Sequence, residues 1–291
     1  MKLSTIRING VEETAIWAGR GLIPVKTINA VYGMAVPAGL LNLIRSGRME
    51  KFNRWYRSVG RDELAGFEAM DPAEVDFAPC YRHPGKIWGI GLNYRRHAAD
   101  LDETAPEAEP ASFMKPDTTI IGSGDTIKIP VQSSRTTAEA ELGIVIGREC
   151  RDISEEDWRD YVAGFTPVLD MTAEDILRKN PRYLTRAKSF DTFFSFGPQL
   201  ITPDEMTDIE NIKVRTIING AVQAKNLIAN MVHSPARLVS FHSRVMTLLP
   251  GDIISTGTPG AAPVREGDTV EAVIDGFEPL VNRVTDLKSA L

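Results

Sequence analysis

Two glutamates, Glu139 and Glu141, stand two residues apart in a run, residues 136–147, that otherwise has the composition of a buried β-strand. Side chains two residues apart on a strand point to the same face, so these carboxylates would lie about 7 Å apart at the usual strand rise. A buried carboxylate is paired with a cation, coordinates a metal or takes up a proton. A divalent cation that prefers oxygen ligands, such as Mg²⁺, Mn²⁺ or Ca²⁺, would satisfy both glutamates. The alternative is an edge strand whose glutamates face solvent.

Three further places could contribute to such a site. Asp170 ends an apolar run, residues 165–170, where the next helix is expected, and a helix-capping role would explain it equally well. Lys188 precedes an aromatic-rich stretch, where a lysine usually snorkels or pairs with an acid. Residues 253–260 lead a strand into small hydroxyl residues and glycines. Such a bend exposes N–H groups that can hold a carboxylate or a phosphate, although it is also compatible with an ordinary turn.

The elements that must position these residues are mainly strands. A Gly-Asp turn precedes an apolar run at Gly124, Gly251 and Gly267, which is typical of β-hairpins. Helices are fewer. We expect one over residues 154–165, with a capping-box-like start and an apolar stripe from Trp158 to Phe165, a short one from Thr172 to Asn180, and one that begins at Ser234-Pro235.

The first eighty residues differ in their sequence pattern from the rest of the chain. Residues 2–8 and 13–17 alternate as strands around the turn-like Asn9-Gly10, and helical patterns follow at 27–32 and 38–59. Residues 69–84 are rich in proline and acidic residues and are interpreted as a linker. We therefore expect a small N-terminal domain, residues 1–80, and a main domain, residues 81–291, in which residues 94–110 form a mobile lid.

Composition limits the classes of partner. The chain has 291 residues, 43% of them hydrophobic, enough for a sizeable core. A net charge of -6 and a pI near 5.4 argue against nucleic acid, whose binding needs a basic surface. No window approaches the apolar length of a membrane span and residues 1–10 do not resemble a signal peptide, so a cytoplasmic protein without a membrane partner is expected. Cys80 and Cys150 are expected to be free thiols.

From Lys86 to its C-terminus the chain resembles the fumarylacetoacetate hydrolase superfamily. The resemblance rests on six short motifs in register, each weak alone. They are Gly-Leu-Asn-Tyr followed by His97 (91–97), Phe-Met-Lys-Pro (113–116), Glu139 with Glu141 and Leu142, Asp170, Lys-Ser-Phe-Asp with a later Gly-Pro (188–191 and 197–198), and Thr-Gly-Thr-Pro (256–259).

The resemblance implies an α+β fold that is mainly β. It consists of a catalytic domain of mixed β-sheets in a roll or barrel-like arrangement, with a small N-terminal α/β unit, usually in a homodimer. The metal ligands of the family correspond to Glu139, Glu141 and Asp170. They would hold Mg²⁺ or Mn²⁺, with Ca²⁺ as a substitute.

The resemblance also implies roles for other residues. His97 would act as the base on the lid, oriented by Asp100 or by Glu103, and Lys188 would stabilise negative charge on a substrate oxygen. Other residues are predicted to bind the substrate. Thr258, together with nearby backbone, would hold the substrate carboxylate. The predicted substrate-binding residues are Asn93, Tyr94, Lys115, Gly257 and Thr258.

The expected substrate is a small 2-oxo acid that chelates the metal through its carboxylate and keto oxygens. If His97 activates a water, the C–C bond of an acylpyruvate- or fumarylpyruvate-like β-diketo acid is hydrolysed through a metal-chelated enolate. Without that water, the same enolate serves decarboxylation of an oxaloacetate-type acid or isomerisation of the 2-hydroxyhepta-2,4-dienedioate type. A catalytically idle relative that binds metal and a small acid is the third hypothesis.

Three positions depart from the family pattern. Asp100 stands where many relatives have the longer glutamate, and Ala261 stands where a glycine is usual. Glu174 occupies a position that is commonly arginine, which reverses a charge near Asp170. These departures affect the choice of substrate and leave the three metal-binding carboxylates complete.

Overall fold

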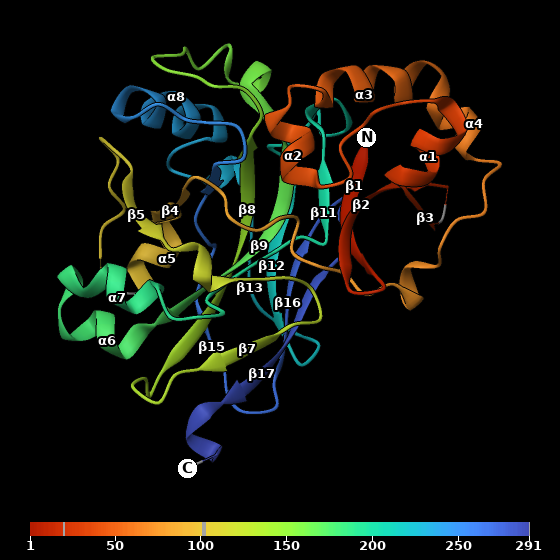
Figure 1. Cartoon of the computed structure of the whole chain (residues 1–291). Helices are drawn as coiled ribbons and strands as arrows, with labels where there is room; N and C mark the ends of the chain where they lie inside the picture. The colour runs from red at the N-terminus through yellow and green to blue at the C-terminus, as the bar shows by residue number, and fades with distance from the viewer. Residues whose placement is uncertain (20, 101–102, 291) are drawn as a thin grey trace.

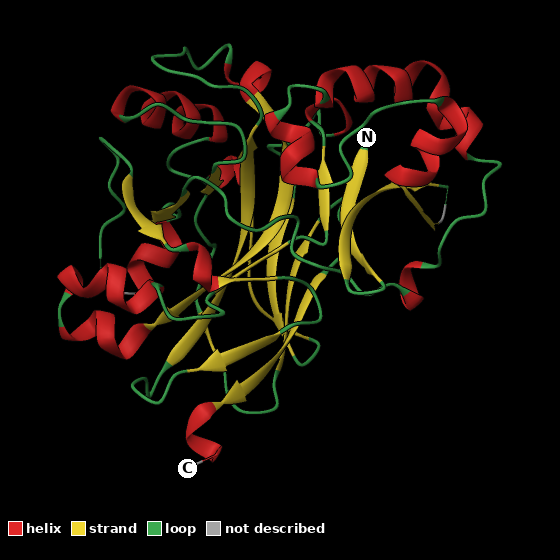
Figure 2. Ribbon diagram, in the orientation of Figure 1, coloured by secondary structure: helices red, strands yellow, loops and turns green. Residues whose placement is uncertain are grey.

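The computed structural model describes every residue except 20, 101–102 and 291, and it shows β-strands at the centre with helices around them (Figure 2). The strands of the larger sheet are β1 (Lys2–Ile8), β2 (Val11–Ala18), β3 (Gly21–Pro24), β4 (Ile87–Gly91), β5 (Ala111–Lys115), β6 (Ile120–Ile121), β8 (Thr136–Ile146), β9 (Val162–Ala173), β10 (Phe194–Phe196), β11 (Gln199–Ile201), β14 (Ile253–Ser255) and β15 (Ala262–Pro263). Those of the smaller sheet are β7 (Thr126–Ile129), β12 (Lys213–Ile218), β13 (Ala221–Leu227), β16 (Thr269–Ile274) and β17 (Leu280–Asp286). The α-helices are α1 (Val25–Tyr32), α2 (Leu40–Arg45), α3 (Met49–Trp55), α4 (Arg61–Leu64), α5 (Arg95–Asp100), α6 (Glu174–Lys179), α7 (Leu184–Lys188) and α8 (Pro235–Val245).

The larger sheet has the strand order β3-β2-β1-β11-β9-β8-β14-β4-β5, and the smaller one has the order β13-β12-β16-β17-β7. Both are mixed: β14 pairs in parallel with β4 and antiparallel with β8, and β17 pairs in parallel with β7. Within the described residues the larger sheet ends at β3 and β5 and does not close into a barrel. The predicted α+β fold with mixed sheets is confirmed.

The long strands β8 and β9 form the centre of the molecule (Figure 1), and every residue of both is buried. Their antiparallel register places Glu139 directly opposite Asp170. On the other face of β8, Ala140, Leu142 and Ile144 belong to the apolar core that also contains residues of β12 and β16. The smaller sheet thus covers the apolar face of this hairpin, and the acidic side chains occupy the opposite face.

The N-terminal strands extend the larger sheet instead of forming a separate one. β1 pairs with β11, and the predicted hairpin is present, with Asn9 and Gly10 both at positive φ. Leu3 and Ile16 of this unit share an apolar cluster with Val145 of β8. The two parts of the chain therefore share a sheet and an apolar cluster. The predicted division into two domains between residues 80 and 81 stays a prediction.

Two predicted helices differ in the structure. The pattern over residues 38–59 is broken into α2, α3 and a π-helical turn, Tyr56–Gly60, because α2 ends just before Gly47, whose φ of +68° is a conformation that glycine adopts without penalty. The α-helix predicted over residues 154–165 is wrong. Within that range only a 3₁₀ turn, Trp158–Tyr161, forms, and from Val162 onward the chain pairs with β8 as strand β9. The helices predicted after Thr172 and Ser234 are present as α6 and α8.

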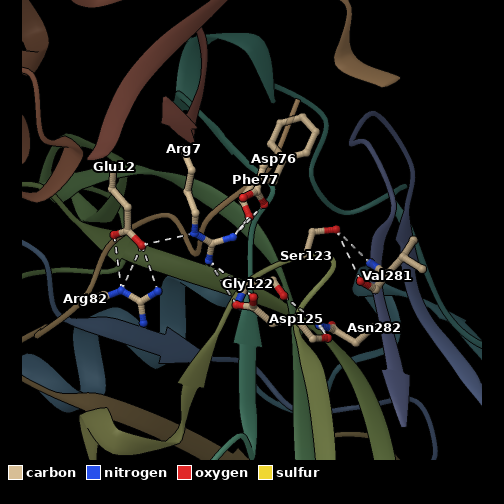
Figure 3. Close-up of polar contacts among 10 residues, drawn as sticks. All are labelled: Arg7, Glu12, Asp76, Phe77, Arg82, Gly122, Ser123, Asp125, Val281 and Asn282. Carbon is tan, nitrogen blue, oxygen red and sulfur yellow. Dashed lines mark hydrogen bonds and ion pairs between the residues drawn. The ribbon is translucent and has the colours of Figure 1, made fainter. Parts of the chain in front are cut away.

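Arg7 joins the N-terminal hairpin to the rest of the molecule (Figure 3). Its Nη1 donates to Asp76 Oδ1 at 2.8 Å and to the Phe77 carbonyl oxygen at 2.9 Å, and its Nη2 lies 3.4 Å from Asp125 Oδ1. Asp125 precedes β7, and its carbonyl oxygen accepts a hydrogen bond from Asn282 Nδ2 on β17 at 2.8 Å. One guanidinium therefore connects the first hairpin, the predicted linker and the smaller sheet.

Across the described residues, no helix combines the length and the apolar character needed to cross a membrane.

Candidate metal centre

Three carboxylates from the central hairpin converge on one buried point. Glu139 and Glu141 project from β8 and Asp170 from β9, and each offers an oxygen within 4.8 Å of the others. Their residues are 6%, 1% and 0% exposed. The solvent-facing alternative for the glutamates is wrong, because β8 is an interior strand between β9 and β14. The alternative capping role of Asp170 is also wrong, since it lies within β9 with its side chain in this cluster.

Two buried lysines neutralise part of this charge. Lys188 Nζ, at the end of α7, lies 2.9 Å from Glu139 Oε2 and 2.5 Å from Asp170 Oδ2. Lys115 Nζ, at the end of β5, lies 2.5 Å from Asp170 Oδ1. Lys188 also lies 4.8 Å from the centre of the Phe113 ring, so one side of the ammonium contacts an aromatic face. The structure brings these predicted residues together with the acidic cluster.

The lysines and burial set the protonation of the cluster. Burial lowers the pKa of Lys115 to about 8, with Lys188 adding to the shift and Asp170 opposing it. For Lys188 burial acts in the same direction, but Asp170 and Glu139 outweigh it, and its pKa is raised. Burial opposes ionisation of Asp170, yet the two ammonium groups hold its pKa below the ordinary value. Asp170 is therefore a carboxylate and Lys188 an ammonium at neutral pH.

Glu141 is the member of the triad that lacks a cation. Its Oε2 accepts hydrogen bonds from Ser255 Oγ at 2.5 Å and from the Gly257 N–H at 2.9 Å. Burial and the neighbouring charge of Asp170 raise its pKa to about 8. Among the described residues no group donates to its Oε1. A buried carboxylate with a raised pKa and a free oxygen indicates that a positive charge belongs at this point.

A divalent cation fits the residues that are present. Three carboxylates face two ammonium groups, so full ionisation leaves a negative charge in a buried site. The donor set consists of hard oxygens, which suit Mg²⁺ and Mn²⁺ alike. The carboxylate oxygens of Glu139 and Asp170 that bind lysine each keep a second lone pair. Glu139, Glu141 and Asp170 could therefore hold the ion without displacing the lysines from the site.

The loop after β14 meets the segment before α5 at Gly257 and Asn93. Gly257 has a φ of +93°, and a Cβ there would lie 2.8 Å from Asn93 Cβ, so only glycine fits. Asn93 Nδ2 donates to the carbonyl oxygens of Thr256 and His233, and its Oδ1 accepts from the His233 N–H. Both residues hold the loops of the site together, and their predicted contacts with substrate stay predictions.

His97 lies on α5, within the segment predicted to form a lid, with 6% of its surface exposed. Burial lowers its pKa, and the opposing charges of Glu139 and Asp100 only partly offset this effect. The imidazole is therefore neutral at neutral pH and can accept a proton. Asp100 is exposed, and Glu103 is exposed as well. Of the predicted lid, residues 94–110, positions 101–102 lie outside the described residues.

Tyr94 and Thr258 occupy the same region. The Tyr94 side chain is fully buried and its hydroxyl has no partner among the described residues. Burial, followed by the charge of Glu141, raises its pKa, so the hydroxyl keeps its proton and can donate. Thr258 Oγ1 donates to the Gly260 carbonyl oxygen at 3.0 Å and stabilises the turn. Their predicted roles toward substrate remain predictions.

Two site residues, Thr172 and Ser255, were not predicted from the sequence. Thr172 Oγ1 donates to Glu139 Oε1 at 2.6 Å, and Ser255 Oγ binds Glu141. Thr172 lies two residues after Asp170 on β9, so strand alternation would have placed it on the acidic face. Ser255 gives no such signal, because the pairing of β14 with β8 brings it there from more than one hundred residues away.

The departures from the family pattern have different surroundings. Glu174 is buried and ion-paired with Arg135 and Arg178. Its charge is therefore compensated by the two arginines. Ala261 is partly exposed in the turn before β15.

The other histidines lie outside the triad. His83 is exposed and contacts Asp117. His233 is buried, and its Nε2 lies 2.6 Å from the Pro106 carbonyl oxygen. His242 is buried in α8, where its Nδ1 contacts the Leu238 carbonyl oxygen.

Known proteins match the chain at the level of sequence. The family profile described as "Fumarylacetoacetate (FAA) hydrolase C-terminal" matches residues 86–285. A protein of Archaeoglobus fulgidus, described as uncharacterized, is 44% identical over 200 residues, which cover 68% of this chain and 78% of the relative.

Solved structures match almost the whole chain. Maleylpyruvate hydrolase from Sphingobium sp. SYK-6 has a TM-score of 0.80 at 28% identity and covers 98% of this chain and 100% of its own. Its complex with manganese(II) ion and pyruvate has a TM-score of 0.80 at 27% identity, with 98% and 99% covered. The 5-carboxymethyl-2-hydroxymuconate delta-isomerase from Mycobacterium smegmatis has a TM-score of 0.75 at 29% identity, with 98% and 99% covered.

These structural neighbours include hydrolases and isomerases, which supports the conclusion that this chain is an enzyme. The manganese complex and the acidic triad found here support a site for a divalent metal. Because the profile matches more than half of the residues and the fold matches over nearly the full length, the chain belongs to the fumarylacetoacetate hydrolase family.

Proposed function

We propose that this chain is a divalent-metal-dependent hydrolase that cleaves a C–C bond in an acylpyruvate-like 2-oxo acid. The observation that carries the proposal is the buried triad of Glu139, Glu141 and Asp170 with Lys188 bound to two of its members. The bound manganese and pyruvate of the maleylpyruvate hydrolase support both the metal and the substrate class.

The residues of this chain divide the chemistry between them. A divalent cation bound at the triad would supply Lewis-acid polarisation of the 2-oxo acid. The Lys188 ammonium, buried and fixed by Glu139 and Asp170, is placed to stabilise negative charge that develops on a substrate oxygen. Burial of the surrounding side chains strengthens that interaction, because little water screens it.

His97 is assigned the proton transfers. Its neutral imidazole takes a proton from a water molecule, and the resulting hydroxide bonds to the acyl carbonyl carbon. The C–C bond to the pyruvate fragment then breaks, with the electron pair remaining on that fragment. The protonated imidazole returns its proton to the carbon that has lost the acyl group, so the products are a carboxylic acid and pyruvate.

An isomerase is the second candidate. The delta-isomerase of M. smegmatis supports it, and so does the burial of His97, since a water-poor site favours proton transfer between two carbons of the substrate over attack by water. In that reaction His97 would remove a proton from one carbon and return it to another.

A product analysis separates the reactions. The protein is stripped with a chelator, reloaded with Mn²⁺ or Mg²⁺, and given acetylpyruvate, fumarylpyruvate, oxaloacetate and 2-hydroxyhepta-2,4-dienedioate in turn. We expect metal-dependent release of pyruvate from the acylpyruvates, and a large loss of that activity in His97→Ala. Release of CO₂ from oxaloacetate alone would identify a decarboxylase, and a spectral change of the dienedioate without pyruvate would identify an isomerase. Metal binding without turnover would favour an idle binder.

We also propose that the chain forms a homodimer, as the family resemblance implies. Light scattering coupled to size exclusion tests this, and a mass close to that of one 32.0 kDa chain would contradict it.

A further inference from the structure

Glu174 carries a buried charge outside the metal triad. Its side chain is 6% exposed. Oε2 accepts a hydrogen bond from Arg135 Nε at 2.8 Å, and Oε1 accepts one from Arg178 Nε at 2.6 Å. The side chains of the two arginines are 47% and 58% exposed, and their Nη groups donate to no other described residue. One buried carboxylate thus holds two guanidinium groups whose side chains are partly exposed to solvent.

Backbone contacts fix this arrangement. The Arg135 carbonyl oxygen accepts the Glu174 N–H at 2.9 Å, which ties the residue before β8 to the first residue of α6. Ser133 Oγ and Ser134 Oγ both donate to the Asp175 carboxylate, at 2.8 and 3.0 Å. The position of Arg135 is therefore set by several bonds between the start of β8 and the start of α6.

The arginine pair lies along the same face as the metal site. Arg135 precedes Glu139 by four residues, and Thr136 pairs with Ala173 at this end of the hairpin. Because side chains alternate between the two faces of a strand, Arg135 lies on the same face as Glu139, about 13 Å from it along the backbone. The negative charges of Glu174 and of Glu139 both act on the pKa of His97, so both groups lie within electrostatic range of the imidazole.

We propose that Arg135 and Arg178, held by Glu174, form a subsite that binds the distal carboxylate of a dicarboxylic substrate whose 2-oxo end lies at the triad. This inference rests on the proposed function and narrows its substrate class to 2-oxo acids with a second carboxylate at the far end of the chain.

Charge and geometry support this assignment. The two guanidinium groups outnumber the one carboxylate, Glu174, that binds them, and their free Nη groups suit the forked hydrogen bonding that carboxylates accept. The backbone offset between Arg135 and Glu139 is comparable to the length of an extended dicarboxylic acylpyruvate. That length includes a metal contact at one end and a charge-assisted hydrogen bond at the other. A substrate with a neutral tail would leave these donors to water and gain no such contact.

The test compares two substrates that differ at the distal end. With fumarylpyruvate and acetylpyruvate, the ratio of kcat/KM values in Arg135→Gln/Arg178→Gln should fall at least about tenfold relative to the wild type, mainly through KM for fumarylpyruvate. Arg178→Lys, which keeps the charge and loses the fork, should retain part of the preference. Arg151→Gln removes an arginine that pairs with its neighbour Asp152 and should leave the ratio unchanged. A double-variant ratio within about twofold of wild type would overturn the subsite.

A binding measurement keeps this inference separate from the proposed reaction. Calorimetry on the Mn²⁺-loaded protein compares 2-oxoadipate with 2-oxohexanoate, acids of equal length of which only the first has a distal carboxylate. We expect the wild type to prefer 2-oxoadipate at least about tenfold, and the double variant to lose that preference. If neither acylpyruvate is turned over but the preference is present and sensitive to the arginines, the reaction is wrong and the subsite stands. Equal affinities for the two acids in the wild type would refute the subsite whatever the activity.

Discussion

Glu139 on β8 is paired directly with Asp170 on β9, so two acidic side chains face each other across the central hairpin. Like charges at directly opposed positions are destabilising. Here Lys188 lies between them, 2.9 Å from one carboxylate and 2.5 Å from the other. The register of the hairpin thus creates the acidic site, and cations from other elements make it tolerable.

Replacing Glu141 with Gln should weaken Mn²⁺ binding at least about tenfold, because it removes a charged metal ligand. Mutating a residue that only orients a metal ligand already costs about tenfold or more in metal affinity. The fold should persist, since the amide oxygen can still accept from Ser255 and Gly257. Burial and Asp170 already raise the pKa of Glu141 to about 8, so the neutral side chain should not lower the Tm of the metal-free protein.

Calorimetric titration with Mn²⁺ measures this effect, and Glu149→Gln, which removes an exposed acid on the turn after β8, serves as the matched control. Undiminished Mn²⁺ affinity in Glu141→Gln would remove Glu141 from the metal site.

The activity should have an acidic limb that belongs to His97. The base must be neutral, and burial places its pKa below 6.5, so at saturating metal kcat/KM should fall about tenfold per pH unit once the pH drops below that pKa. His97→Gln should lower the rate about a hundredfold or more and abolish this limb. The pH profile of acylpyruvate cleavage measures both effects. A limb with the same midpoint in the variant would assign it to another group.

Buried His242 should make stability depend on pH. Burial lowers its pKa in the folded protein below 6.5, so the unfolded chain binds more protons in the window below 6.5. Stability is then complete above that pH and decreases as the pH falls. When the pH is lowered from about 7.5 to 5.5, the free energy of unfolding measured in urea should fall by about 1 kcal/mol less in His242→Gln than in the wild type. An unfolding free energy that depends on pH equally in His242→Gln and in the wild type would contradict this assignment.

Removing the Arg7 guanidinium should destabilise the protein by about 1 kcal/mol, because its side chain is only 22% exposed and it binds Asp76, the Phe77 carbonyl oxygen and Asp125 at once. Urea unfolding of Arg7→Met measures this loss. Arg54→Met provides the comparison: its ion pair with Glu50 is 73% and 76% exposed and should contribute at most about 0.5 kcal/mol. Equal effects of the two substitutions would refute the role of Arg7 as a link.

Much of the metal site could be predicted because it depends on local pattern. The spacing of Glu139 and Glu141 places them on one face of any strand, whatever the strand pairs with. The hairpin at Asn9-Gly10 and the capped helix α8 are equally local, since turn and cap geometry depend on neighbouring residues.

The wrong helix prediction over residues 154–165 has the opposite cause. Trp158, Tyr161 and Phe165 recur at helical spacing, but pairing with β8 satisfies the backbone from Val162 onward and buries both faces of the strand. A strand buried on both faces loses its alternating pattern and resembles a helix in sequence.

By itself the sequence determined that two carboxylates share a strand face, that the body is mainly β, and which family the chain resembles, because these follow from period-two alternation, turn residues and ordered motifs. Only the tertiary structure decided that Asp170 faces Glu139, that Lys115 and Lys188 meet on it, and that Arg135, Arg178 and Glu174 form one cluster. These contacts depend on strand register and on the docking of α6, α7 and β5, which long-range packing fixes and local sequence does not encode.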